Sequence, residues 1–260
     1  MMKLLGISVV GAAIVGAGIG LQRENGQKSA STSLQTSDAG PLRFRDAFEA
    51  LCVNTCDTAV WADTQEIDGR LIGVASAYGR TGILLAQAQP RRGRVPKADV
   101  IARFPKVGSG ARLIVSFEFL IPKGYPANSV HLLDVECADC AEGGNPGIRV
   151  YLRHGRLRVD RSKIGIEHAW TNDNALEVTP DTWHRVDLVA TMSADDDVGM
   201  IAVDMDGARV LDGQGRTLLP ERQPGFDRLQ FGITATSNSV PAAVMFDNFD
   251  AAITPRAPAS

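Results

Sequence analysis

The sequence predicts an all-β protein built as one antiparallel sandwich of two sheets, and three observations carry this prediction. Between Asp181 and Leu211 apolar residues alternate with polar ones on both sides of a polar loop, which is the pattern of strands with one buried face. Asp206-Gly207 separates two such runs, and Asp-Gly favours a two-residue hairpin turn. Helical periodicity is weak beyond residue 60, and roughly twelve short segments bounded by turn residues fit a sandwich.

The expected strands follow one another along the chain. The domain begins with LRFRDAFE at 42–49, and Gly79 to Gly82 forms a turn inside the next expected pair, 73–89. Apolar alternation is clearest from Arg112 to Ile121, where Pro122 and Gly124 end the strand. His154-Gly155 forms a tight turn between two short strands. Further strands are expected at 100–104, 129–137, 147–153, 156–160, 183–192, 201–205, 208–211, 227–236 and 242–253.

Composition limits the classes of function. The chain has 260 residues, of which 44% are hydrophobic, enough for one substantial core, and we expect a single sandwich domain over residues 41–255. The formal charge of -3 and the pI near 5.8 argue against a nucleic-acid partner held by bulk electrostatics, because phosphate neutralisation needs a clustered basic excess.

The N-terminus is typical of a targeting segment. Met1 to Lys3 carries one positive charge, and the next 18 residues, Leu4 to Leu21, are uncharged and apolar, which is the lower limit for crossing a bilayer. We predict a signal peptide or membrane anchor at residues 1–22 and a flexible linker at 23–40. The protein is therefore expected to be exported, whether secreted, periplasmic or held at the cell envelope, with membrane contact only through this anchor.

The four cysteines form two close pairs, Cys52 with Cys56 and Cys137 with Cys140. In an exported chain disulfides are the first expectation, and three connectivities are open. Two local bridges are favoured, each shaping a loop. A four-cysteine zinc site is the less favoured alternative.

The sequence also resembles known families. The motif W-x-x-V followed by v-x-v-x-x-D-G-x-x-v, from Trp183 to Val210, resembles the hairpin of concanavalin A-like jelly rolls. N-P-G-I-x-V-x-L-x-x-G-x-L, which starts at Asn145, together with this hairpin resembles heparin-lyase-like polysaccharide lyases over about a third of the chain. The resemblance implies a jelly-roll β-sandwich and a protein that acts on polysaccharide, with cleavage by β-elimination as the enzymatic form.

A basic face favours an acidic, uronate-containing polysaccharide as substrate. Alternation sends Arg149, Tyr151 and Arg153 to the face opposite Ile148 and Val150, and guanidinium groups pair well with carboxylates. β-Elimination needs a cation to neutralise the uronate and groups that move protons. The candidates for catalysis are Tyr151, His131, His168 and Arg149; those for substrate binding are Arg153, Arg161, Lys163, Trp170, Asn172 and Asn174. In a lyase, Arg149, Tyr151 and Arg153 should line one groove with His131 or His168.

Three other functions remain open: hydrolysis, glycan binding without cleavage, and a structural role in the cell envelope for a protein held there by Leu4 to Leu21. Asp134, Glu136 and Asp139 have the i, i+2, i+5 spacing of the acidic strand in laminarinase-like glycoside hydrolases, which work with paired carboxylates. In this sequence Asp replaces the outer two Glu residues of that pattern. A lectin-like module that binds glycan without cleaving it explains the same fold with no catalytic motif.

One metal site is conceivable. If the first and last strands meet, Asp46, Glu49, Asp247 and Asn248 come together, and their oxygens suit calcium. No cofactor is required for the expected function, and a structural calcium is the favoured metal.

Overall fold

The computed structural model describes residues 40–50, 60–140 and 145–256. The predicted leader, residues 1–22, residues 23–39 of the predicted linker and the Cys52/Cys56 pair lie outside the described residues. The part of the chain that is described contains no helix long and apolar enough to cross a membrane.

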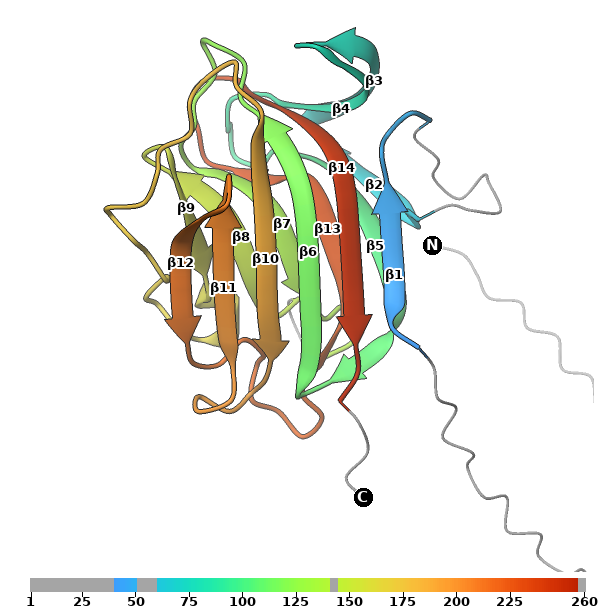
Figure 1. Ribbon diagram of the computed structural model, residues 1–260, viewed down its shortest axis with the longest axis vertical. Helices are drawn as coiled ribbons and strands as arrows, with labels where there is room; N and C mark the ends of the chain where they lie inside the picture. Colours follow the sequence, from blue (N-terminus) through green and yellow to red (C-terminus); the bar gives the residue numbers. More distant parts are fainter. Residues whose placement is uncertain (1–39, 51–59, 141–144, 257–260) are drawn as a thin grey trace, which may run out of the picture. The chain divides into compact units, whose positions relative to one another are not determined.

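Two antiparallel sheets pack face to face as a jelly-roll sandwich (Figure 1). The eight-stranded sheet contains, in spatial order, β12 (Ala208–Gln214), β11 (Met200–Met205), β10 (His184–Met192), β6 (Ala111–Leu120), β14 (Ala242–Thr254), β4 (Arg80–Ala88) and β3 (Gly69–Ala77), with β1 (Leu42–Asp46) also paired to β14. The six-stranded sheet contains β2 (Asp63–Ile67), β5 (Lys97–Gly108), β13 (Gly225–Thr236), β7 (Val130–Glu136), β8 (Gly147–Arg153) and β9 (Arg156–Asp160). A 3₁₀ helix, η1 (Ser162–Ile164), follows β9.

The predicted hairpin forms as expected and joins β11 to β12. Asp206 and Gly207 both have positive φ, 53° and 79°, as a type I′ turn requires. His154 and Gly155 do the same between β8 and β9. His184, at the start of β10, is buried, and its Nδ1 lies 2.7 Å from Asp206 Oδ2. The turn is therefore tied to the neighbouring strand.

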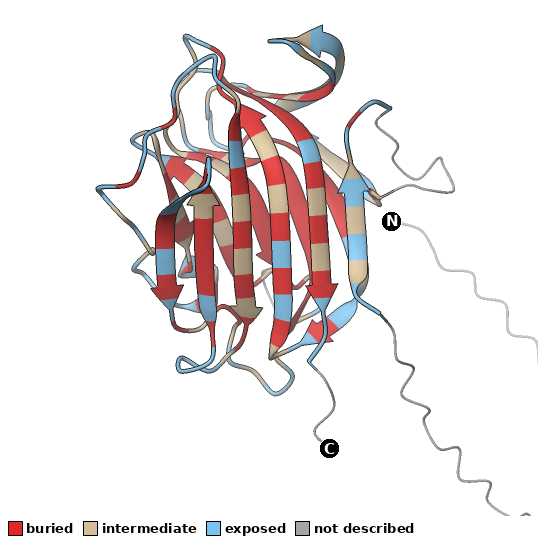
Figure 2. Cartoon of the chain, viewed as in Figure 1, coloured by how far each residue is buried: buried red, intermediate tan, exposed pale blue. Residues whose placement is uncertain are grey.

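The core lies between the sheets and is rich in aromatic rings. Phe231 of β13 contacts Phe246 and Phe249 of β14 with ring centroids 4.7 and 4.6 Å apart. Trp61 packs on Phe249 and donates its Nε1–H to Asp46 Oδ2 at 2.6 Å. Along the strands buried and exposed residues alternate, which appears as stripes on the front sheet in Figure 2. β2 is the one strand that sequence alternation did not predict, because DTQEI has a single apolar residue.

The two termini of the domain meet at β14, as expected. β14 pairs with β4 through Ala242 to Phe246 and with β1 through Phe249 to Ile253. The switch between partners falls at a register shift after Asp247, where Asn248 has a positive φ of 52°. This junction gathers the residues of the predicted calcium site.

Candidate active site

The outer face of the six-stranded sheet, the face turned away from the core, is strongly polar. β8 buries Ile148, Val150 and Leu152 in the core. The alternate residues Arg149, Tyr151 and Arg153 therefore lie on the outer face, as the sequence predicted. β9 follows the same rule and brings Arg158 and Asp160 beside them.

These side chains line one pocket of about 510 Å³, called here the β8 pocket. It is lined by His131, Arg149, Tyr151, Arg153, Arg158, Asp160, Glu167, His168, Ala169 and Thr171. All four catalytic candidates and the binding candidate Arg153 thus meet in one place, although His131 and His168 are 37 residues apart in the sequence. Strand pairing explains part of this, because His131 of β7 lies opposite Tyr151 of β8.

His131 and Tyr151 form a stacked pair, with ring centroids 5.0 Å apart and planes inclined by 16°. Burial, with the nearby charge of Arg149, lowers the pKa of His131 to about 3. The imidazole is therefore neutral at ordinary pH. Among the described residues, neither His131 Nδ1 nor the Tyr151 hydroxyl has a hydrogen-bond partner.

The three arginines of the β8 pocket differ in how far they are already neutralised. Arg149 forms an ion pair with Asp160, and its Nη2 also donates to Ser162 Oγ at 3.2 Å. Arg158 pairs with Asp173 at 3.0 Å. Arg153 is exposed and makes no ion pair with any described residue. Its guanidinium is the one in this pocket left to bind an anionic ligand.

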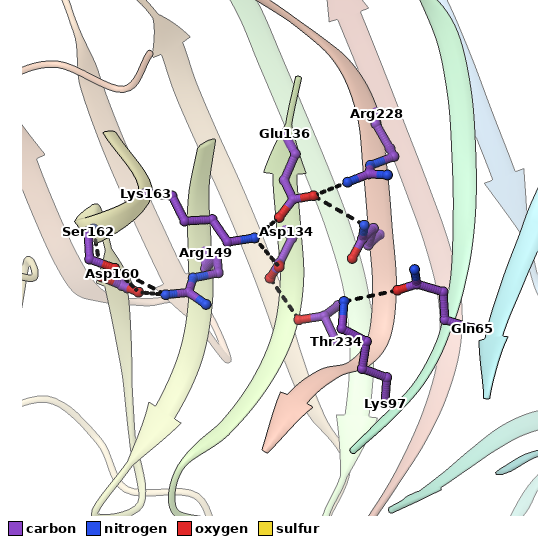
Figure 3. Close-up of polar contacts among 11 residues, drawn as sticks. Gln65, Lys97, Asp134, Glu136, Arg149, Asp160, Ser162, Lys163, Arg228 and Thr234 are labelled. Carbon is purple, nitrogen blue, oxygen red and sulfur yellow. Dashed lines mark hydrogen bonds and ion pairs between the residues drawn. The ribbon is translucent and has the colours of Figure 1, made fainter. Parts of the chain in front are cut away.

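A buried charge network occupies the centre of the outer face (Figure 3). Glu136 accepts ion pairs from Lys163 and Arg228, and Gln230 Nε2 donates to its Oε2 at 3.1 Å. Burial alone would raise the pKa of Glu136, but Lys163 and Arg228 outweigh it and hold the pKa below its usual value. Lys163, predicted to bind substrate, therefore points into the network.

Asp134 lies beside Glu136 on the same face, as the strand period predicts. It accepts a hydrogen bond from Thr234 Oγ1 at 2.7 Å, and Lys163 Nζ lies 3.7 Å away. Burial raises the pKa of Asp134, and the charge of Glu136 adds to this effect. Asp139 does not join them. It is exposed and lies beyond the strand, in a separate small pocket beside Arg103 and Asp227. The hydrolase arrangement is thus incomplete, and its two strand carboxylates are already bound to side chains.

Several predicted sugar-binding residues lie outside the β8 pocket. The Arg161 guanidinium stacks over Trp170, 3.8 Å from the ring centroid. On its other contact Trp170 packs against Gly213 of β12, where a Cβ atom on residue 213 would lie only 2.5 Å from the indole ring. Asn172 Oδ1 accepts the backbone N–H of Asn174 in a local turn. Trp170 therefore contacts β12 and Arg161, where the sequence suggested a platform for a sugar ring.

The Cys137–Cys140 disulfide forms, as one of the two favoured local bridges. It directly follows β7, whose last residue is Glu136. Asp227 of β13 accepts the backbone N–H groups of Ala138 and Asp139 at 2.7 and 3.2 Å. The bridge and this cap together hold the chain where it leaves the charge network.

The four residues of the predicted calcium site do gather at the β14 junction. Glu49, Asp247 and Asn248 line a pocket of about 400 Å³ with Arg80 and Glu118, and Asp46 lies in the adjoining one. The carboxylates of two of them, however, face protein donors. Arg80 Nη1 is 2.9 Å from Asp247 Oδ2, and Asp46 accepts from Trp61 and from the Phe48 backbone. Within residues 40–256, gaps excepted, no three His, Cys, Asp or Glu side chains converge as metal ligands. The Arg80 guanidinium takes the central position.

Replacement of Arg80 tests this reading of the junction. Arg80 forms a bidentate ion pair with Glu118 and a second ion pair with Asp247. The pair with Arg80 holds the pKa of Glu118 below its usual value. Arg80→Met should lower the free energy of unfolding at pH 7 by about 2 kcal/mol, because two largely buried carboxylates lose their cation. Calcium should restore part of this loss in the variant, as urea titrations would show. Arg45→Met, at an exposed pair with Asp250, should cost less than about 1 kcal/mol. An equally small loss for both variants would contradict the assignment.

The sequence did not single out Lys97, Asp99, Arg228, Gln230 or Thr234, all of which lie on the outer face. Each alternates with a core residue of β5 or β13, for example Lys97 and Asp99 with Ala98 and Val100. Alternation could therefore have placed them outward. Polar residues on an outward face are normally solvated, so nothing local indicated that Asp99, Arg228 and Gln230 would be buried.

Comparison with known proteins identifies the family. The family described as polysaccharide lyase matches residues 57–250, three quarters of the chain. The chain belongs to this family. The match covers the strands from β2 almost to the end of β14, so this polysaccharide lyase family member carries both sheets of the fold and the β8 pocket within the matched region.

Solved structures agree with the fold of this family member. An endo-β-1,4-glucuronan lyase from the fungus Trichoderma reesei superposes with a TM-score of 0.58 at 16% identity, covering 75% of this chain and 91% of that one. The alginate lyase Aly36B gives 0.54 at 11% identity, and the cellulose induced protein Cip1 gives 0.55 at 11%, each covering 82% of this chain and 97% of the other. No functionally curated protein matches the sequence significantly.

Proposed function

We propose that this protein cleaves an acidic, uronate-containing polysaccharide by β-elimination in the β8 pocket. The observation that carries the proposal is the meeting of His131, Tyr151, His168 and Arg153 in that one pocket. Similarity in fold to a glucuronan lyase and an alginate lyase supports an acidic substrate. Export, predicted from residues 1–22, is part of the proposal, and the Cys137–Cys140 disulfide suits an oxidising compartment.

The reaction assigns a task to each group. A base removes the proton from the carbon α to the uronate carboxylate, and a cation beside the carboxylate stabilises the negative charge that develops. The electron pair then forms a carbon–carbon double bond as the glycosidic C–O bond breaks, and an acid protonates the leaving oxygen. The products are an unsaturated uronate and a new chain end.

Tyr151 and Arg153 fit these tasks best. The Tyr151 hydroxyl has no hydrogen-bond partner within the described chain, so it is available to the substrate, and Arg153 lacks a competing carboxylate. His131 is a poor base, because its pKa of about 3 lies far below neutral pH. We assign it to holding the Tyr151 ring, with His168 as the second proton carrier.

Arg153→Ala should raise the KM for a polyuronate about tenfold or more, because the variant removes the one unpaired guanidinium of the β8 pocket. Initial rates over a range of polymer concentrations give the value. Arg156→Ala is the matched control: Arg156 lies opposite Arg153 across the β8–β9 hairpin but is paired with Glu177 at 2.6 Å. Equal KM values for both variants would show that Arg153 does not contribute to substrate binding.

The proposal is tested by incubating the purified protein with glucuronan, alginate and neutral glucans. Ultraviolet absorbance of the unsaturated product measures elimination, and new reducing ends measure cleavage of any kind. Absorbance that grows with polyuronates alone is the expected result. Reducing ends without absorbance would replace the proposal with hydrolysis. Retention of glycan with no cleavage would replace it with a lectin-like function.

A further inference from the structure

Asp99 of β5 is a buried carboxyl that has no hydrogen-bond partner within the described part of the chain. Ala98 and Val100 point into the core, so Asp99 lies on the outer face, opposite Gly232 of β13. Its exposed fraction is 0%, and neither of its oxygens accepts a hydrogen bond from any described residue. Gln230, the diagonal neighbour on β13, is also buried and has an unpartnered Oε1. An ionised carboxylate without donors is costly in such a place, whereas a neutral carboxyl is tolerated.

The groups around Asp99 come from each element packed against it. On its own strand the nearest charged residue is Lys97, and the neighbouring strand β2 contributes Gln65. The strands on the other side contribute Arg228, Gln230 and Thr234 of β13 and Asp134 and Glu136 of β7. Arg149 of β8 and Lys163 of η1 lie farther along the same face. Burial raises the pKa of Asp99 to about 8; Lys97 opposes this effect and Asp134 adds to it. The carboxyl therefore carries its proton at neutral pH.

The charge of the outer face depends on that proton. In the network of Figure 3 the cations are Lys97, Arg149, Lys163 and Arg228, and the carboxylates are Asp134, Glu136 and Asp160. The cations exceed the carboxylates by one while Asp99 is neutral. Lys97 affects the pKa of both Asp99 and His131 of the β8 pocket, so a charge on this part of β5 acts on the pocket.

We propose that Asp99 sets the affinity of the outer face for polyuronate: neutral Asp99 leaves the network of Figure 3 with a net positive charge, and ionised Asp99 cancels that charge and weakens binding. The proposal rests on the proposed function for its ligand. It adds a determinant of affinity that lies outside the β8 pocket, on β5 of the same sheet. Asp99 on β5 is separated from β8 by β13 and β7, about 14 Å at the usual strand spacing. Its burial from water limits the screening of its charge over that distance.

Binding of alginate and glucuronan at pH 6–9, followed by affinity electrophoresis or calorimetry, tests the proposal without any need for cleavage. The wild-type Kd should rise about fivefold from pH 7 to pH 9 at low salt, and less at high salt. Asp99→Asn, which cannot ionise, should keep the pH 7 affinity throughout. Asp63→Asn on the neighbouring strand, where Asp63 is exposed, should follow the wild type. Asp99→Ser provides a second uncharged variant should the amide fold poorly.

Thermal unfolding gives an independent readout. The folded pKa of Asp99 is raised, so its contribution to stability is greatest at low pH and is lost as the pH rises to about 8. The Tm advantage of Asp99→Asn over the wild type should therefore grow between about pH 4 and pH 8 and then level off.

The outcomes separate this inference from the proposed function. Matching pH profiles for wild type and Asp99→Asn, in binding or in Tm, would overturn the role of Asp99 even if unsaturated product forms. If the Kd of the wild type depends on pH and Asp99→Asn removes this dependence, the role of Asp99 is supported even if no product forms. The absence of product in that case would reject only the lyase reaction. Absence of polyuronate binding at every pH would reject both.

Discussion

Tyr151→Phe should lower kcat on polyuronate by about 10²–10⁴-fold, the usual loss when a group that transfers protons is removed. The substitution deletes only a hydroxyl that has no hydrogen-bond partner in the described structure, and it keeps the ring that stacks on His131. Unfolding midpoints and the Kd for polyuronate should therefore change little. Rates of unsaturated product formation at saturating substrate measure the effect.

Tyr125→Phe is the matched control for this prediction. Tyr125 lies in the connection between β6 and β7 and does not line the β8 pocket. It should retain full activity. If Tyr151→Phe also keeps nearly full kcat, then Tyr151 does not transfer a proton in the reaction, and His168 becomes the candidate to replace next.

Glu136→Gln should be the most destabilising of the substitutions discussed, with a loss of about 3–5 kcal/mol in the free energy of unfolding at pH 7. Glu136 is almost fully buried and pairs with both Lys163 and Arg228. The amide leaves two cations without their carboxylate. Urea titration at several pH values measures the loss.

The pH dependence of this loss has a definite sign. The pKa of Glu136 is lowered in the fold, so its stabilisation is present above the unfolded value of about 4.3 and disappears as the pH falls through the folded value. The difference between wild type and variant should shrink in acid. Asp139→Asn, which is exposed, should change stability by less than about 0.5 kcal/mol. A large loss of activity in Glu136→Gln with unchanged stability would instead indicate a catalytic carboxylate.

Local pattern was a good guide wherever a strand has one buried face. Alternation from Gly147 to Arg153 correctly placed Arg149, Tyr151 and Arg153 together, and Asp206-Gly207 correctly located a hairpin. The same reasoning missed β2, whose pairing with β5 depends on backbone hydrogen bonds and hardly on side-chain pattern. It also predicted that Lys163 and Arg161 bind substrate. A sequence shows that a residue is cationic but does not show which carboxylate or aromatic ring it contacts in the fold, here Glu136 for Lys163 and Trp170 for Arg161.

The sequence by itself determined the all-β sandwich, the resemblance to polysaccharide lyases and the outward direction of the residues on β8, since period-2 alternation and turn chemistry are local properties of the chain. Only the tertiary structure decided which outward residues share the β8 pocket and which neutralise one another. Strand order places Glu136 of β7 between the cations of β13 and η1, and it places Asp99 of β5 on the other side of β13. Burial and pairing of charges arise from contacts between segments far apart in the sequence, so Arg153 is left free while Arg149 and Lys163 are not.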